Sequence, residues 1–520
     1  MLFRSYLKTD FLLLTDVFEN FRSMCREHYK LDPANYLTSA SLAWDAMLLK
    51  TKIELDLISD VNILDMFEKS KRGGLTFVGA KRYAQANNKE MGKQYDKNKP
   101  DSYITYVDAN NLYGWATSEA LPYKDIKFVE GVTLETLLDT EDDAETGYML
   151  EADLEYPEEM QEKFKQFPPC PESLIPKDEW FSDYQKNVME LTNSKSKTEK
   201  LVPHLMKHEN YVLHYRNLKF VHGLGVKVNV KRVISFKQSK WMSGYINDNN
   251  QLRMKAKAEK NEFLVSLFKL MNNSVFGKTM ENVRNRQNMH LTIDRENAIK
   301  WFSKLEFKDA TYIDGLYLIQ THKTSIVYDK PIYVGCSILD LSKIRMLDFH
   351  YNTIEANFKG KYNLLYSDTD SLVYQIEHKN LHKWMKANGN EFDLSNMSDE
   401  YKDETNNNVL GKMKSEVGSK IITEFCALSP KSYCYKYCEK EVKKAKGVSL
   451  NVSEKTMAFC DYEGVMSGSG YQTRDIYGIR SFNQQLFTTL TNKVVLNAFY
   501  DKMKMIDDRT CEPFGYITKK

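Results

Sequence analysis

The feature that most constrains this chain is a pair of carboxylates in the turn of a predicted β-hairpin. Residues 362–366 and 372–376 are rich in Leu, Val, Ile and Tyr, which is typical of short strands, and the polar residues 367–371 between them suit a tight turn. Asp368 and Asp370 lie two positions apart, so in strand-like geometry their side chains point the same way. Two such charges favour divalent cations, and a pair of oxygen-ligated Mg²⁺ ions stabilises in-line displacement at phosphorus.

A third carboxylate ends another predicted strand. Residues 103–107 have strand composition, Asp108 follows them, and residues 110–114 turn the chain. An Asp in this position, beside backbone N–H groups, is well placed to hold a metal next to a triphosphate. Taken singly, each of these features has a simpler explanation, because Asp, Ser and Thr are common in turns and helix caps. Their significance therefore depends on the other motifs.

The longest helical pattern covers residues 250–286 and predicts two different faces. At 100° per residue, Lys269, Asn273 and Phe276 fall together on one side of the helix. The roughly opposite side is an apolar stripe of Phe263, Leu264, Leu267, Leu270 and Met271. Arg253 and Lys257, one turn apart, add cations with the same facing as Lys269. A Lys, an Asn and an aromatic ring away from the core suit a phosphate contact and a base-stacking platform.

Composition indicates a globular protein with several domains. The 520 residues are 42% hydrophobic and 12% aromatic, and the net charge is only +2. Nucleic-acid binding must therefore come from local clusters among the 73 Lys and Arg residues. No apolar run approaches the length of a membrane span and no signal peptide is recognisable, which predicts an intracellular protein without membrane contact.

Two further segments suit a nucleic-acid backbone. Residues 430–447 alternate aromatic and basic side chains, although a soluble edge strand would also carry Lys. Residues 71–74, Lys-Arg-Gly-Gly, place a basic pair next to glycines that allow close backbone approach, with a flexible linker as the alternative.

The region between residues 130 and 240 looks like an inserted module. It begins with an acidic stretch, becomes rich in Lys near residue 190, and alternates apolar and basic residues from 211 to 240 as half-buried strands would. His204 and His208 have the i,i+4 spacing of helical metal ligands but lack the glutamate of the metalloprotease motif. We therefore expect both histidines at the surface.

Three motifs in chain order carry a resemblance to a known family. They are Asp108-Ala-Asn-Asn-Leu-Tyr-Gly114, Lys269-Leu-Met-Asn-Asn-Ser-Val-Phe-Gly-Lys278 and Tyr366-Ser-Asp-Thr-Asp-Ser371. Together they resemble motifs A, B and C of family B DNA polymerases, most closely the protein-primed branch of phage, adenoviral and Polinton (Maverick) transposon polymerases. The resemblance implies an α+β right-hand fold with a palm of antiparallel sheet and helices, helical fingers and a thumb, preceded by a remnant of an RNase H-like exonuclease domain.

By this resemblance the chain divides into six parts. They are the C-terminal exonuclease remnant (1–70), a linker with a glycine motif and the first palm segment (71–125), an inserted subdomain of the protein-primed type (126–240), fingers (241–290), the rest of the palm (291–448) and a thumb or partial thumb (449–520).

The resemblance also implies roles for individual residues. The expected catalytic residues are Asp108, Asp368 and Asp370, and Asp108 and Asp370 are the expected metal ligands. The residues expected to bind the nucleotide are Leu112, Tyr113, Arg253, Lys257, Lys269, Asn273, Phe276 and Gly277. The residues expected to bind DNA are Arg72, Gly73, Gly74, Ser274, Thr369, Lys431 and Tyr433. Among these, Tyr113 is expected to exclude a 2′-hydroxyl, Lys269 to hold the triphosphate, and Lys431 and Tyr433 to steady the primer terminus.

The implied activity is template-directed transfer of dNMP to a primer 3′-hydroxyl in DNA replication. It requires two Mg²⁺ ions, with Mn²⁺ as an alternative, and the partners are template and primer DNA, dNTPs and a terminal priming protein. A transposon origin would imply a nuclear location.

The chain departs from the family pattern at three places. Tyr6 to Asp10 is similar to the third exonuclease motif, but the two upstream acidic motifs have no counterpart, so we expect no 3′–5′ exonuclease activity. Phe276 stands where most relatives have Tyr, and Gly114 replaces the usual Pro.

Two alternatives stay open at this stage. A catalytically idle transposon-derived fragment would only bind DNA or a protein partner. A metal-dependent nuclease would explain the carboxylates but not Lys269 or Tyr113.

Overall fold

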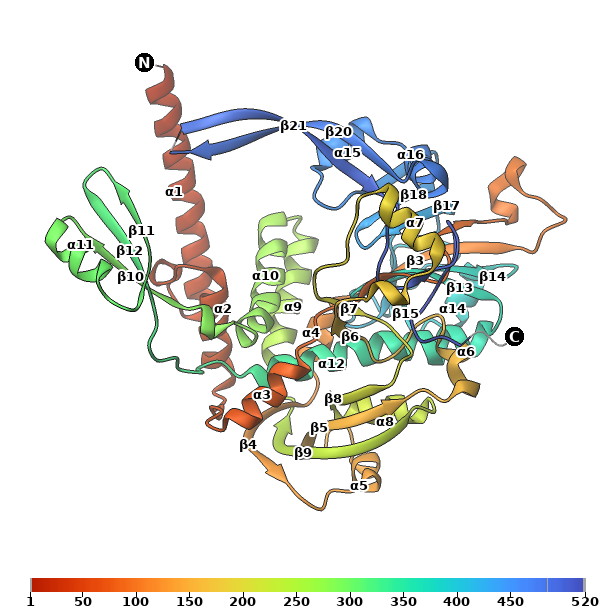
Figure 1. Cartoon of the computed structure of the whole chain (residues 1–520), viewed down its shortest axis with the longest axis horizontal. Helices are drawn as coiled ribbons and strands as arrows, with labels where there is room; N and C mark the ends of the chain where they lie inside the picture. The colour runs from red at the N-terminus through yellow and green to blue at the C-terminus, as the bar shows by residue number, and fades with distance from the viewer. Residues whose placement is uncertain (1, 484, 518–520) are drawn as a thin grey trace.

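A mixed, mainly antiparallel sheet forms the centre of the computed structural model, which describes residues 2–483 and 485–517 (Figure 1). Strands far apart in the sequence alternate in it, because the hairpin of β13 and β14 inserts between β1 and β3. In spatial order the main strands are β1 (Thr76–Val78), β13 (Tyr362–Asp368), β14 (Ser371–Glu377), β3 (Ser102–Ala109), β17 (Ile422–Ser429), β18 (Ser432–Tyr437) and β19 (Lys440–Lys444). The shorter strands β2 (Tyr83–Gln85), β15 (Phe392–Asp393) and β16 (Met413–Ser415) complete it.

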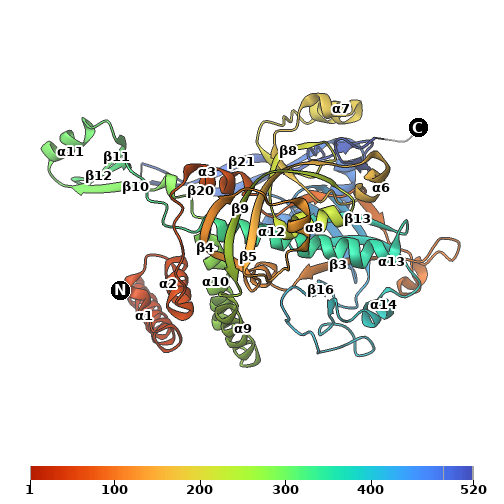
Figure 2. The ribbon, with the colours of Figure 1, turned by 90° about the horizontal axis from the view of Figure 1, so that it is seen from below.

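One long helical segment packs on this sheet and forms much of its core. It begins with α12 (Ile332–Asp348), continues through a π-helical stretch (Phe349–Glu355) and ends in α13 (Ala356–Phe358) (Figure 2). The segment is buried on nearly all sides. From Met346 onward its apolar side chains join the sheet residues in one hydrophobic cluster, whereas most of those in residues 333–341 pack in a second cluster with α2 (Ser39–Thr51), α3 (Val61–Ser70), α9 (Ser243–Ala258) and α10 (Glu262–Thr279). The composition of residues 332–334 predicts a strand, which is wrong, because these residues form the first turn of α12.

The N-terminal region is helical and consists of α1 (Leu2–Tyr29), α2 (Ser39–Thr51) and α3 (Val61–Ser70). The single helical pattern predicted for 250–286 is wrong. The structure has two helices, α9 (Ser243–Ala258) and α10 (Glu262–Thr279). Between them, Lys260 is in the left-handed region with a φ of 57°, and Asn261 caps α10.

The buried face of α10 differs in part from the predicted stripe. Leu267 and Met271 are buried as expected, but Phe263 and Leu270 are about half exposed. The buried face is rotated because α10 packs against both α2 and α9, and an amide pair, Asn249 with Asn272, joins α9 to α10 at 2.8 Å.

The predicted inserted module contains a second antiparallel sheet. Its order is β4 (Leu121–Val129), β9 (Lys227–Ser239), β5 (Thr146–Glu155) and β8 (His208–His214). The prediction of strands throughout 211–240 is wrong, since α8 (Tyr215–Gly223) interrupts them and buries Tyr215, Leu218 and Val221. The side chain of His214 caps this helix by accepting the Arg216 N–H.

A separate small unit lies across the predicted boundary between the fingers (241–290) and the rest of the palm (291–448). Strands β10 (Gln287–Thr292), β12 (Leu316–His322) and β11 (Phe307–Ile313) form their own sheet, accompanied by α11 (Arg295–Phe302). The unit projects from the body in both views (Figures 1 and 2).

The C-terminal region contains α15 (Leu450–Thr456), α16 (Phe459–Gly464) and a long hairpin of β20 (Tyr471–Phe482) and β21 (Gln485–Asn497). The sequence pattern predicts a helix over residues 483–504, which is wrong, because Thr and Val with strand propensity dominate 488–495 and pair with β20. None of the helices in the described ranges is both long and apolar enough to span a lipid bilayer.

Two fully buried histidines predict acid sensitivity of the fold. Burial lowers the pKa of His214 and of His350 from 6.5 to about 3, so both rings are neutral in the folded protein. The unfolded chain binds protons at both positions below about pH 6.5. The free energy of unfolding should therefore fall as pH decreases from there toward 3, by roughly 1 kcal/mol per pH unit for each ring. Urea denaturation between about pH 7 and pH 5 measures this slope.

The matched variant for this prediction is His214→Asn. Asn keeps an acceptor for the Arg216 N–H at the start of α8 but does not titrate. We expect a shallower pH slope in this variant, whatever its stability at neutral pH. An unchanged slope would contradict the contribution assigned to His214.

Candidate active site

The three predicted carboxylates come together where the β13–β14 hairpin meets β3. Asp108 is paired in register with Ser371, directly after the hairpin tip. The Ala109 N–H donates to the carbonyl of Asp370 at 2.7 Å, and the Asp370 N–H donates to the carbonyl of Asp368 at 2.7 Å. This pairing therefore brings Asp108 together with Asp368 and Asp370, which are about 260 positions away in the sequence, at one end of the central strands.

The electrostatics of this end of the strands fit a divalent cation. Burial, and then the charges of Asp370 and Glu416, raise the pKa of Asp108 to about 8. The pKa of Asp370 is also raised, mainly by burial and further by the negative charge of Asp368. Buried carboxylates that repel one another are stabilised in their charged form by an oxygen-seeking cation. The donor set thus fits a metal ion held by Asp108 and Asp370.

The turn between the hairpin strands is held by the glycine segment. Thr369 has a φ of 61°, and its N–H donates to the carbonyl of Leu75 at 2.9 Å. A Cβ on Gly74 would lie 2.3 Å from the Thr369 Oγ1, whereas a Cβ on Gly73 would meet no atom within 4 Å. Gly74 therefore allows the backbone of this segment to lie against the hairpin tip.

Replacing Gly74 by Ala tests this contact. The clash with Thr369 should lower the free energy of unfolding by about 1–3 kcal/mol, as overpacking does, and should displace the hairpin tip. Gly73→Ala is the matched control and should have little effect. Thermal unfolding compares the two variants. Adding Thr369→Gly should restore stability to the Gly74→Ala protein, and a failure to restore it would place the effect elsewhere.

Arg72 occupies a position unlike the predicted DNA contact. Its side chain is buried, its Nη1 donates to the carbonyl of Val212 at 2.6 Å, and its guanidinium lies 3.5 Å from the Tyr211 ring centroid. These contacts join the inserted module to the segment that leads into β1, so they hold the two sheets together.

Motifs A and B meet through two aromatic rings. Tyr113 lies on α4 (Leu112–Thr117), and its ring stacks on Phe276 of α10 with centroids 4.6 Å apart and an interplanar angle of 11°. Burial and the Asp370 charge raise the pKa of the Tyr113 hydroxyl to about 12. The side chain of Leu112 is buried in the core, so only its backbone is available to a ligand.

The exposed face of α10 carries Lys269, Asn273 and Gly277, each one turn after the previous one. The charge of Lys269 acts on both Asp108 and Asp370, lowering the pKa of each against the effect of burial. Ser274 and Phe276 are partly buried on the same helix.

The second helix of the pair supplies the other predicted cations. Arg253 is partly buried and Lys257 is exposed, both on α9. Burial lowers the pKa of Arg253, although a guanidinium stays charged at neutral pH.

Lys431 and Tyr433 lie next to the carboxylates but differ in access. The Lys431 Nζ lies 3.1 Å from the Asp368 Oδ2, and its backbone N–H donates to the Tyr366 hydroxyl at 2.7 Å. Tyr433 is buried, shares a hydrogen bond of 3.0 Å with the Tyr106 hydroxyl, and packs on the Tyr366 ring. Lys431 is thus at the surface of the site, and Tyr433 supports it from below.

Sequence reasoning missed three residues of this site. Glu416, after β16, contributes negative charge to Asp108 and Asp370, and the Thr76 hydroxyl donates to the Asp368 Oδ1 at 2.7 Å. The Lys502 Nζ donates to the carbonyl of Thr76 at 2.8 Å, and burial lowers the pKa of Lys502 to about 8. None of them lies in a motif, so no local sequence signal pointed to them.

Comparison with known proteins defines the class. The chain belongs to the type B DNA polymerases of organelles and viruses, because the sequence model of that family matches residues 3–356. It is a template-directed DNA polymerase, as the three motifs predicted. A search of curated proteins finds no match to this chain.

Among the similar solved structures are those of Phi29 DNA polymerase. Its complex with primer-template DNA and incoming nucleotide substrates matches with a TM-score of 0.52 and 13% identity, over 89% of this chain and 68% of that chain. Its complex with primer-template DNA matches with a TM-score of 0.50 and 14% identity, over 91% and 70%. At this identity the likeness establishes the fold, and the predicted α+β right-hand architecture is confirmed.

Proposed function

We propose that Asp108 and Asp370 hold the divalent metal ions of the polymerase reaction, with Mg²⁺ as the ion, and that Asp368 completes the acidic set. The observation that carries this proposal is the pairing of β3 with β14, which places two partly buried carboxylates of like charge at the same end of these strands. When bound, Mg²⁺ supplies Lewis-acid stabilisation of charge on phosphoryl oxygens and lowers the pKa of a bound hydroxyl.

The substrates of this site are a dNTP and a primer paired with its template. Lys269, with Arg253 and Lys257 on the neighbouring helix, provides positive charge for the triphosphate. The stacked rings of Tyr113 and Phe276 form an apolar floor on which the sugar and the nascent base pair rest. These side chains position the substrates, which supplies a large part of catalysis in nucleotidyl transfer.

The DNA strands are expected to contact Lys431, the exposed Gly73 and the partly exposed Thr369 and Ser274. Lys431 is 61% exposed at its side chain although it lies against Asp368, so a primer phosphate can reach it. Contacts of this kind read phosphate and shape, and they weaken steeply as salt rises. The sheet that contains β4, β5, β8 and β9 is proposed as the surface for a terminal priming protein.

The test is extension of a primed single-stranded template by the purified protein with Mg²⁺ and dNTPs. Product lengths that stop where the template demands an omitted nucleotide would establish templated synthesis. Salt-sensitive DNA binding without extension would instead support the idle-fragment alternative. Degradation of the primer without added dNTPs would support the nuclease alternative.

A further inference from the structure

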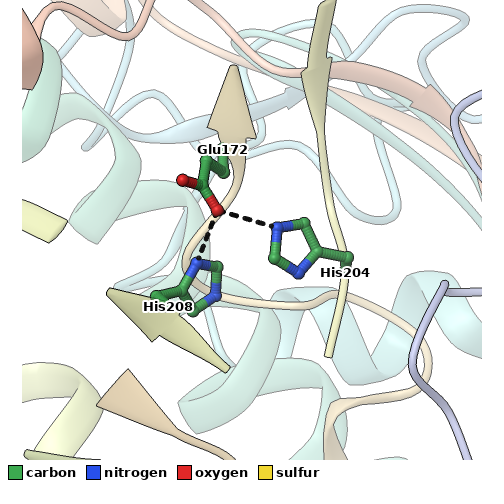
Figure 3. Close-up of side chains that lie close together, drawn as sticks. All are labelled: Glu172, His204 and His208. Carbon is green, nitrogen blue, oxygen red and sulfur yellow. Dashed lines mark hydrogen bonds and ion pairs between the residues drawn. The ribbon is translucent and has the colours of Figure 1, made fainter. Parts of the chain in front are cut away.

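A compact cluster of Glu172, His204 and His208 lies far from the palm carboxylates in the sequence and on other strands (Figure 3). Glu172 begins β6 (Glu172–Leu174), which pairs with β7 (Lys200–Val202), and His208 begins β8. His204 lies between β7 and β8, and it forms a parallel bridge with Phe514. The prediction that both histidines lie at the surface is wrong, since they are 1% and 0% exposed.

The three side chains converge on one carboxylate oxygen. The His204 Nε2 and the His208 Nδ1 each lie 3.2 Å from the Glu172 Oε2, as Figure 3 shows. Hydrogen bonds from imidazole to a carboxylate are usually shorter, about 2.7–2.9 Å when charge-assisted. Ligand atoms around a tetrahedral Zn²⁺ with bonds of about 2.0–2.1 Å lie about 3.3 Å apart. The observed separations are closer to the ligand spacing of a metal.

The remaining polar atoms of the two rings have no partners of their own. Within the described part of the chain, the His204 Nδ1 and the His208 Nε2 are buried without a hydrogen bond. The rings stack with centroids 4.4 Å apart. The charge of the Arg72 guanidinium, which lies over the Tyr211 ring, also acts on His208. Apolar side chains in place of the two histidines would fill the same space without the free-energy cost of buried, unpaired nitrogen atoms.

We propose that Glu172, His204 and His208 form a second metal site, specific for a divalent transition-metal ion of the Zn²⁺ class. Two imidazoles and a carboxylate are ligands that Zn²⁺ prefers, whereas Mg²⁺ prefers oxygen ligands alone. The side chain of Glu172 is 37% exposed, which gives the ion an entry path and leaves room for a water ligand.

The ion would act as a structural cross-link. It would tie β6 to the segment that joins β7 and β8, and through His204 to the C-terminal segment at Phe514. The Leu205 N–H, which donates to the Phe514 carbonyl at 2.8 Å, continues the same connection. This role is independent of the proposed Mg²⁺ site and of nucleotide transfer.

The test measures Zn²⁺ binding to the full chain in excess Mg²⁺, after metal removal with a chelator and dialysis. We expect one Zn²⁺ per chain by elemental analysis and a higher unfolding temperature with Zn²⁺ than without. Co²⁺ should give the visible absorption of a tetrahedral or five-coordinate site, and Zn²⁺ should abolish it. Absence of tight Zn²⁺ binding by the folded wild-type protein would overturn the proposal.

Variants assign the ion to these residues. Glu172→Gln, which keeps the size of a partly exposed side chain, should weaken Zn²⁺ binding more than about 10-fold, and His208→Gln should do so as well. His322→Gln, at an exposed position on β12, is the matched control and should bind Zn²⁺ like the wild type. Equal binding by Glu172→Gln and the control would overturn the assignment.

A palm variant separates this inference from the proposed function. The Asp108→Asn/Asp370→Asn protein should retain its Zn²⁺ stoichiometry and its Co²⁺ spectrum. Loss of Zn²⁺ in that variant alone would place the ion in the palm and overturn the second site, whatever the outcome of primer extension.

Discussion

Replacing Asp370 by Asn is expected to lower the rate of primer extension by at least about 10³-fold, because it removes a charged metal ligand that contributes several kcal/mol to the transition state. The same change should leave the unfolding temperature in metal-free buffer unchanged or raise it. Burial raises the pKa of Asp370, which means that the charged carboxylate is unfavourable in the folded protein, and Asn removes that cost. Single-turnover extension and thermal unfolding of the same preparation measure both effects.

The matched control for this variant is Asp314→Asn. Asp314 lies in the turn between β11 and β12 with a φ of 45°, a conformation that Asn adopts readily, so neither folding nor extension should change. The wild type should gain stability from Mg²⁺ and the Asp370 variant should gain much less. Retention of more than a tenth of the wild-type rate by Asp370→Asn would contradict its role as a ligand.

Replacing Lys269 by Met is expected to lower kcat/KM for the incoming dNTP by about 10²–10³-fold, because one positive charge is lost beside the triphosphate. Lys269 is exposed on α10, and no ion pair or hydrogen bond engages its side chain within residues 2–483 and 485–517. Its charge nevertheless reaches Asp108 and Asp370. The loss should therefore appear in activity and not in stability. Steady-state kinetics over a range of dNTP concentrations measure it.

Lys300→Met controls for the loss of a surface charge, since Lys300 is exposed on α11. Lys269→Arg should recover part of the activity, because it restores charge with a different geometry. A rise in KM for the primer-template instead of the nucleotide would show that Lys269 serves the DNA.

The active-site motifs were predictable because their chemistry is local. Asp368 and Asp370 lie in a turn between two short apolar segments, and Asp108 follows another such segment, so strand composition and turn residues were enough to place them. Helical periodicity, which depends only on spacing, predicted that Lys269 and Asn273 share an exposed face of the helix.

Other elements depended on tertiary partners. The apolar stripe of α10 was misplaced because two neighbouring helices, α2 and α9, determine which side is buried. The helix predicted over residues 483–504 is replaced by strand β21, because pairing with β20 along the whole hairpin decides its conformation. Arg72 lies in a basic segment that predicts a DNA contact, but its guanidinium contacts Tyr211 and Val212 of the inserted module.

The sequence by itself determined the class of protein and predicted the carboxylates that we propose as metal ligands, since motif spacing specifies which side chains share a strand end or a helix face. Only the tertiary structure decided which charges act together. Glu416 and Lys502 join the palm carboxylates, and Glu172 meets two histidines more than 30 positions away, as the intervals of 32 and 36 residues show. Electrostatic interaction depends on distance in space and on burial, and neither can be read from separation along the chain.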